Sequence, residues 1–159
     1  MKILNTTAIV LLITFTLVLS CSVTENNEAG GTATEKFAGE WVVNVIRDGN
    51  AFGKTNIATY NTAKNTNTEM WLDDLENTWG LKTKVNLEAN TNMFFGNNLP
   101  EVYFDITVNI TNGIIVKEGA VAPSGAVVDS IYFNAEFSDI PGEIWQYSGY
   151  KRTGFLEDE

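Results

Sequence analysis

Few residues of this chain have the chemistry that catalysis requires. Its 159 residues include no histidine and a single cysteine, Cys21. The absence of histidine excludes a Ser-His-Asp or Cys-His mechanism and a histidine-ligated zinc ion. A hydrolase built from this chain would need a serine with a lysine base, or a pair of carboxylates. The sequence therefore predicts no catalytic residue, no metal site and no cofactor.

Two weak catalytic candidates remain. Ser124 lies in Pro-Ser-Gly, which is typical of a turn and lacks the Gly-x-Ser-x-Gly arrangement that exposes a nucleophile. Asp73 and Asp74 are the best carboxylate pair, for acid/base chemistry or for calcium, but adjacent residues of a strand point to opposite faces. We expect one of the two to cap a turn before Glu76 and the other to lie in solvent.

Aromatic side chains are better candidates for binding. Sites for small molecules are mostly apolar, with a few well-placed polar groups. Seven aromatic residues could line such a cavity: Tyr60, Trp71, Trp79, Phe104, Phe133, Trp145 and Tyr147. The alternative is that most of these rings fill the interior, because a small barrel encloses about enough room for its own side chains or for one small ligand.

The first 21 residues indicate export and a lipid anchor. Lys2 precedes an apolar run at residues 8–19, which is typical of a signal peptide. About 12 apolar residues are too few to cross a bilayer, which takes roughly 20. Residues 17–21, Leu-Val-Leu-Ser-Cys, resemble the lipobox of bacterial lipoproteins, which implies cleavage after residue 20 and acylation of Cys21. The alternative is an ordinary signal with an incidental thiol.

We therefore divide the chain into a signal peptide at residues 1–20, a lipidated flexible tether at 21–36 and a folded domain at 37–159. The tether is small and polar and has no aromatic residue before Phe37. Asp and Glu outnumber Lys and Arg by 20 to 10, and so acidic a chain would repel nucleic acid. We expect a protein of the bacterial cell envelope, in the outer membrane or on the cell surface, that contacts the membrane through its anchor only.

From residue 37 onward, apolar and polar residues alternate with a period of two, as in half-buried strands. We expect strands near residues 41–46, 57–62, 69–74, 79–89, 93–95, 102–110, 114–121, 131–137 and 144–153. Asn112-Gly113 is a hairpin signal between two of them. Short strands at regular spacing indicate an antiparallel barrel or a sandwich.

The start of the domain favours the barrel. Gly39-Glu40-Trp41 resembles the Gly-x-Trp of lipocalins, in which the tryptophan crosses the closed end beneath an arginine of the last strand. Arg152 would be that partner, stacked on the indole of Trp41. The alternative is a core tryptophan after a turn glycine. We expect an all-β fold, an antiparallel lipocalin-like up-and-down barrel of eight or nine strands.

A series of short motifs in one order carries a family resemblance. The motifs are AGEWVV at residues 38–43, YNTA at 60–63, MWLDDL at 70–75, KTKV at 82–85, PSG at 123–125, DSI at 129–131, SGY at 148–150 and RTGF at 152–155. In these the chain is similar to lipid-anchored proteins of Bacteroidetes called the lipid-binding putative hydrolase family. The resemblance implies a lipocalin-like barrel with a lipid or other small apolar ligand.

Three functions remain open at this point. The first is a non-catalytic lipoprotein whose barrel binds a lipid or other apolar molecule. The second is a hydrolase of unknown substrate, which the family name implies and the missing histidine disfavours. The third is a surface module whose exposed tryptophan and tyrosine rings stack on sugars. An empty apolar cavity would favour the first function, and exposed aromatic residues would favour the third.

Overall fold

The computed structural model describes residues 31–88 and 90–159, so the predicted signal peptide and Cys21 lie outside the described residues. Its elements are η1 (Glu35–Phe37), β1 (Gly39–Arg47), β2 (Asn50–Asn61), β3 (Glu69–Asp73), β4 (Lys82–Glu88), β5 (Met93–Pro100), β6 (Thr107–Val121), β7 (Val127–Phe137), β8 (Trp145–Lys151) and η2 (Leu156–Asp158). Within this part of the chain, neither helix has the length and apolar composition to cross a membrane.

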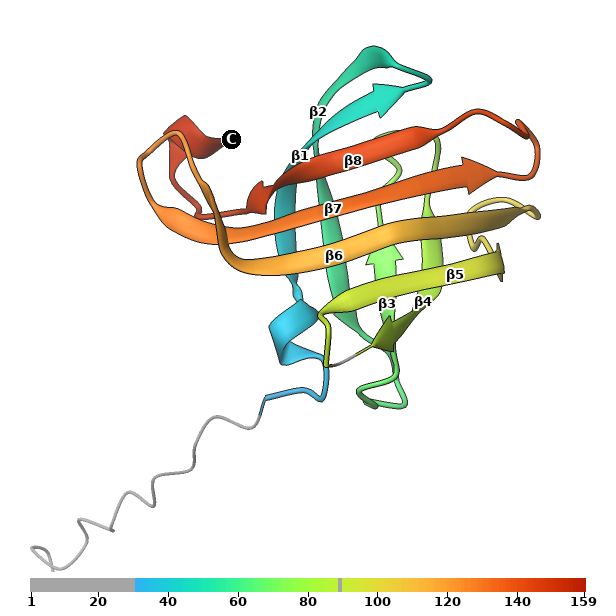
Figure 1. Ribbon diagram of the computed structural model, residues 1–159, viewed down its shortest axis with the longest axis horizontal. Helices are drawn as coiled ribbons and strands as arrows, with labels where there is room; N and C mark the ends of the chain where they lie inside the picture. The colour runs from blue at the N-terminus through green and yellow to red at the C-terminus, as the bar shows by residue number, and fades with distance from the viewer. Residues whose placement is uncertain (1–30, 89) are drawn as a thin grey trace, which may run out of the picture. The chain divides into compact units, whose positions relative to one another are not determined.

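The strands form a closed antiparallel barrel (Figure 1). Each strand pairs with its neighbours in sequence, and β1 also pairs with β8, with Trp41 opposite both Ile57 and Lys151. The prediction of an all-β up-and-down barrel is confirmed, with eight strands in the described part of the chain. In Figure 1 the long strands β6 and β7 cross in front of the short strands β3 and β4.

The up-and-down order places alternate connections at the same end of the barrel. Residues 48–49, 74–81, 101–106 and 138–144 form one end, which we call the mouth. The opposite end carries η1, the other three hairpin connections and the C-terminal segment, and we call it the closed end.

Aromatic rings fill the barrel interior. Phe133 and Tyr147 stack with their ring centres 4.5 Å apart, and Phe94 packs on Phe133 at 5.8 Å. Phe137 meets Trp145 edge to face at 6.2 Å. All five side chains are fully buried, and atoms without accessible surface have no space beside them that a water molecule could occupy. The interior is therefore packed like other protein cores.

A short chain of hydrogen bonds seals the closed end. The indole nitrogen of Trp41 donates to Oγ1 of Thr59 over 2.8 Å, and that hydroxyl donates to the carbonyl of Phe37 over 2.6 Å. Thr34 and Phe37 are buried, so Thr34, which lies in the predicted tether at residues 21–36, packs against the barrel together with Phe37. The 3-10 turn is thereby fixed beneath Trp41.

The predicted stacking of Arg152 on Trp41 is wrong. The cation above Trp41 is Lys151, whose Nζ lies 5.9 Å from the ring centre. Lys151 is paired directly with Trp41 in the barrel, whereas Arg152 follows the end of β8 and points the other way. The guanidinium of Arg152 instead pairs with Glu40 at 2.8 Å and with Glu159 at 2.7 Å.

The predicted hairpin at Asn112-Gly113 is a bulge inside one long strand. β6 runs through it, and its register with β7 shifts between Thr111 and Ile114. Asn112 has a φ of 55°, which an asparagine tolerates in a bulge as well as in a turn. A side chain at Gly113 would collide with the carbonyl of Phe94, which is 2.2 Å from the position of its Cβ. Pairing of β6 with β5 therefore makes this dipeptide a bulge rather than a hairpin turn.

We expect Phe133→Ala to lower the free energy of unfolding by about 3–5 kcal/mol, because the substitution leaves a cavity beside Tyr147. Urea denaturation followed by circular dichroism measures this change. Phe95→Ala is the matched control, because Phe95 is 46% exposed and its removal leaves no cavity. A similar small loss for both variants would contradict a filled interior.

Candidate functional site

The barrel separates the seven aromatic residues proposed as ligand contacts. Phe133 and Tyr147 belong to the filled interior, Tyr60 and Trp71 lie on the outer face of β2 and β3, and Trp79, Phe104 and Trp145 meet at the mouth. Only Trp79 and Phe104 line a pocket together, because Trp145 is fully buried, so the mouth is the candidate site.

A turn around Asp74 positions Trp79. The Asp74 carboxylate accepts hydrogen bonds from the backbone N–H groups of Glu76 at 2.9 Å, Gly80 at 3.1 Å and Thr78 at 3.3 Å, and from the Thr78 hydroxyl. The prediction that one aspartate caps this turn is confirmed. The predicted strand over residues 79–81 is wrong, because the carboxylate draws the backbone into a turn and β4 begins at Lys82.

A second buried carboxylate positions Phe104. Glu101 is 6% exposed and accepts hydrogen bonds from the backbone N–H groups of Tyr103 at 2.9 Å and Phe104 at 2.6 Å. The predicted strand over residues 102–106 is therefore wrong, and β6 begins at Thr107. Sequence reasoning missed Glu101, because nothing in the local pattern distinguishes a carboxylate buried against backbone N–H groups from a solvated one.

Trp79 and Phe104 flank an open pocket. The pocket has a volume of about 240 Å³ and is lined by these two rings and Asp139. Gly80 has a φ of 92°, and a Cβ there would lie 2.5 Å from the Phe104 ring. Glycine is thus needed at this position for the backbone conformation and for the close approach of the ring.

Trp145 packs against Trp79 but does not line this pocket. Its fully buried ring lies 5.9 Å from Trp79 and 4.9 Å from Phe52, which projects from β2 and is 47% exposed. Phe104 is 53% exposed, and the nearby Val102 and Leu75 also face solvent. An exposed apolar surface of this kind is typical of an interaction site.

The polar groups of the mouth are bonded to one another. Arg47 lies 5.4 Å and 5.1 Å above the rings of Trp79 and Trp145 and binds Glu143 through two hydrogen bonds of 2.5 Å and 3.1 Å. These bonds raise the pKa of Arg47 and lower that of Glu143. The indole of Trp79 donates to Asp139 over 3.2 Å. The surface that the mouth offers to a ligand is therefore mainly apolar.

Asp73 forms a separate cluster on the outside of the barrel. Its carboxylate is 2% exposed and accepts hydrogen bonds of 2.7 Å from the hydroxyls of Tyr60 and Tyr103, with Nζ of Lys82 at 2.8 Å. The prediction that the second aspartate is solvated is wrong, because Tyr103 folds over it from the 101–106 connection. Asp73 thus ties that connection to β3.

The charges in this cluster favour a structural role. Burial alone would raise the pKa of Asp73, but hydrogen bonds from Lys82, Tyr60 and Tyr103 outweigh it, so the pKa is lowered. The hydrogen bond to Asp73 raises the pKa of Lys82. Its ammonium also lies 5.9 Å from the ring centre of Trp71. A lysine held protonated in this way cannot act as a base or nucleophile at neutral pH.

The remaining catalytic candidate has a structural partner. The Ser124 hydroxyl donates to Asp158 over 2.7 Å, and the Ser124 backbone N–H donates to the same carboxylate over 2.6 Å.

Across residues 31–88 and 90–159 no group of histidine, cysteine and acidic side chains is arranged to hold a metal ion. A larger hollow of about 590 Å³ lies at the closed end, but its lining is mostly polar and includes Glu35, Lys117 and Asp129.

Comparison with known families identifies one match. The family described as lipid-binding putative hydrolase matches residues 26–156, which is most of the chain and includes all eight strands described above. No curated protein matches the sequence.

Asp73→Asn should destabilise the domain at pH 7 by about 1–3 kcal/mol, because Lys82 and two tyrosine hydroxyls lose an ionised acceptor. The pKa of Asp73 is lower in the folded state, so its contribution is present above about pH 4 and is lost as pH falls further. We therefore expect the difference between variant and wild type to narrow at pH 3 in urea denaturation. Asp105→Asn removes the same charge at an exposed site and should show no such pH-dependent difference.

Proposed function

Because the chain belongs to the lipid-binding putative hydrolase family, we propose that it is a non-catalytic binding protein that holds a lipid or other apolar ligand at the barrel mouth. The observation that carries this proposal is the open pocket between Trp79 and Phe104 above a filled interior. Two buried carboxylates hold these rings in place without a ligand, which lowers the entropic cost of binding.

The size of the pocket supports partial enclosure of the ligand. About 240 Å³ is less than the 300–1,000 Å³ of typical ligand sites. The pocket therefore suits one end of an apolar molecule, and the rest would lie across Phe52, Leu75 and Val102, which are each about half exposed. This differs from a ligand enclosed within the barrel, which the packed aromatic rings exclude.

The charges of the mouth favour an uncharged ligand. Arg47 is neutralised by Glu143, which leaves the Asp139 carboxylate as the unpaired charge beside the pocket. A free carboxylate on the ligand would be repelled by Asp139. We therefore propose a neutral lipid group, such as an acyl ester, rather than a free fatty acid.

Exposed rings at the mouth also fit the alternative of sugar stacking. Recognition of a sugar requires polar groups that are free to bond its hydroxyls. Arg47, Glu143 and Asp139 already bond within the protein, so the mouth suits an apolar ligand better. The binding experiment below includes sugars for this reason.

We also propose export to the bacterial cell envelope and anchoring through acylated Cys21, in the outer membrane or on the cell surface. The support is the apolar run at residues 8–19 and the lipobox-like residues 17–21. A single acyl chain gives only marginal membrane binding, whereas the two or three chains of a lipoprotein give a stable anchor.

Titration with N-phenyl-1-naphthylamine, an uncharged probe that fluoresces in apolar surroundings, tests ligand binding. We expect Trp79→Ala and Phe104→Ala each to weaken binding about tenfold, since a stacked ring contributes on the order of 1.4 kcal/mol. Phe95→Ala is the control, because it removes an exposed ring on β5 away from the mouth. A neutral monoacylglycerol should displace the probe. Equal affinities for all variants, or displacement by oligosaccharides alone, would contradict the proposal.

Metabolic labelling with radioactive palmitate tests the anchor. The wild-type chain should incorporate label and have the mass of a chain that begins at Cys21 with acyl groups attached. Cys21→Ser should incorporate none, because the acceptor thiol is absent, while Ser22→Ala should be labelled normally. Label retained in Cys21→Ser, or an unmodified wild-type mass, would refute the anchor.

A further inference from the structure

The tip of the β6–β7 hairpin is uncharged and apolar. Residues 119–128, Gly-Ala-Val-Ala-Pro-Ser-Gly-Ala-Val-Val, contain no charged side chain, although the chain as a whole is 19% charged. Val121 is 67% exposed and Val127 is 61% exposed, and they are paired directly across the hairpin. Two valines therefore project side by side into solvent.

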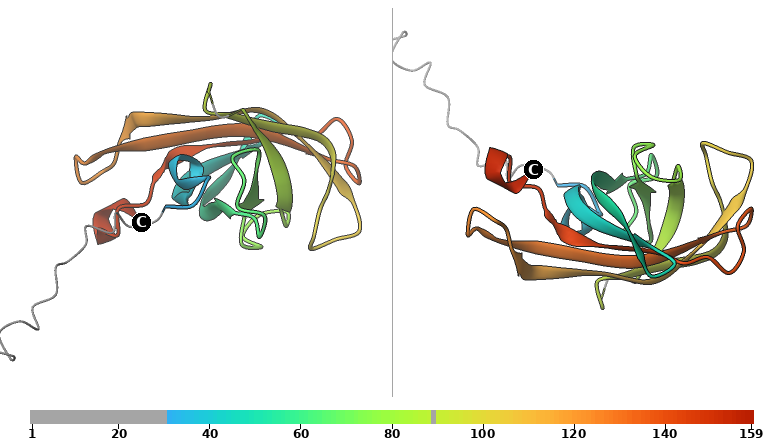
Figure 2. Two further views of the ribbon diagram at one scale, coloured as in Figure 1. Left: turned by 90° about the horizontal axis from the view of Figure 1, so that it is seen from below. Right: turned by 90° about the horizontal axis from the view of Figure 1, so that it is seen from above.

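The C-terminal segment adds two more apolar residues at this end. Phe155 is 55% exposed and Leu156 is 90% exposed. Both views of Figure 2 show η2 beside the hairpin, as Figure 1 does. We call Val121, Val127, Phe155 and Leu156 the apolar tip.

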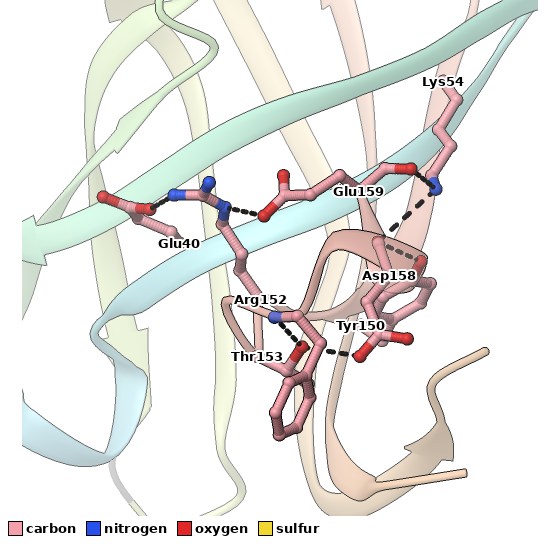
Figure 3. A network of polar contacts seen from close by, with 8 residues as sticks. Glu40, Lys54, Tyr150, Arg152, Thr153, Asp158 and Glu159 are labelled. Carbon is pink, nitrogen blue, oxygen red and sulfur yellow. Dashed lines mark hydrogen bonds and ion pairs between the residues drawn. The ribbon is translucent and has the colours of Figure 1, made fainter. Parts of the chain in front are cut away.

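A buried carboxylate holds the two parts of the apolar tip together. Asp158 is fully buried and binds Ser124 of the hairpin and the hydroxyl of Thr153. Its pKa is lowered, because these hydrogen bonds outweigh the effect of burial. Figure 3 shows this side chain bound to Thr153, and the hydroxyl of Tyr150 donating to the Asp158 carbonyl over 2.7 Å.

Ion pairs fix the segment on either side of Asp158. Figure 3 shows Arg152 between Glu40 and Glu159, and Lys54 donating to the carbonyl of Glu159 over 2.7 Å. The exposed Phe155 and Leu156 thus belong to a segment bonded at several points to the barrel. Apolar side chains held exposed in a fixed arrangement mark an interaction surface.

The position at which the chain enters the domain indicates what the apolar tip contacts. Thr32 and Lys36 line the same hollow as Lys117 of β6 and Asp129 of β7, close to the base of the hairpin. Only about ten residues separate Cys21 from this point, and a chain of that length reaches at most roughly 35 Å. An anchor at Cys21 would keep the closed end of the barrel near the bilayer.

We propose that the apolar tip is a membrane-contact surface that inserts into the headgroup region of the anchoring bilayer. The inference rests on the acylated Cys21 proposed above. An uncharged tip suits zwitterionic lipids, and its residues are of the kind that enter the interface. This contact adds to the anchor, whereas the net charge had suggested that only the anchor touches the membrane. The mouth, at the other end of the barrel, would then face away from the bilayer and be open to ligand.

Site-specific fluorescence quenching tests the inference. The acylated full-length protein is reconstituted into phosphatidylcholine vesicles that contain a headgroup-region nitroxide lipid. Acylation consumes the thiol of Cys21, so a bimane label reacts only with an introduced cysteine. We expect the label at Val127→Cys to be quenched at least threefold more than the label at Val102→Cys, a valine of similar exposure at the mouth. Equal quenching at both sites, or stronger quenching at residue 102, would overturn the proposal.

A second variant separates the tip from the anchor. Adding Leu156→Asp to Val127→Cys should reduce quenching toward the level of residue 102, while flotation shows the protein still bound to vesicles through its acyl chains. If the lipid does not quench the label and sedimentation shows that the protein dimerises through the apolar tip, the tip contacts a second copy of the chain. That result would overturn the proposal. If the mass of the wild-type protein shows no acyl groups, the anchor itself is refuted. Binding of the fluorescent probe at the mouth is measured in a separate experiment, so its result does not depend on the anchor or on the apolar tip.

Discussion

A closed barrel of eight strands encloses room for little more than its own side chains, and the rest of this structure depends on how that room is used. The aromatic rings of Phe94, Phe133, Phe137, Trp145 and Tyr147 occupy it with no accessible surface left. Stability thus comes from the same interior that some other barrels use for ligands. The interior therefore leaves no room for a ligand.

Buried carboxylates determine the structure of those ends. Asp74 and Glu101 accept backbone N–H groups at the mouth, Asp73 binds two tyrosines and a lysine beside it, and Asp158 joins the C-terminal segment to the β6–β7 hairpin. A carboxylate that accepts several hydrogen bonds compensates for its desolvation. Some of the acidic residues that give the chain its negative net charge therefore act as loop anchors, and the four named here are buried.

The two ends differ in chemistry in a way that suits different partners. The mouth presents aromatic rings beside a paired arginine and glutamate and an open pocket. The closed end presents aliphatic and phenyl side chains on an uncharged hairpin and an adjacent segment. Flat rings with nearby polar groups suit a discrete ligand, whereas projecting aliphatic groups suit a broad apolar phase. A domain oriented by its closed end would present its mouth to the surroundings.

The period-two pattern from Trp41 onward was sufficient to predict an all-β fold, because alternation records which face of each strand is buried. The choice of a barrel over a sandwich depended on Gly39-Glu40-Trp41. The family resemblance was also apparent from the order of the short motifs, and residues 26–156 match that family. Neither predicted the mouth. Trp79 and Phe104 were assigned to strands because the local pattern does not show that the carboxylates of Asp74 and Glu101 are buried and accept nearby backbone N–H groups. The Asn112-Gly113 bulge was assigned to a hairpin because the local sequence does not show the pairing of β6 with β5. Which aromatic rings are enclosed and which are exposed was decided only when the strands closed into a ring and the connections folded over buried carboxylates.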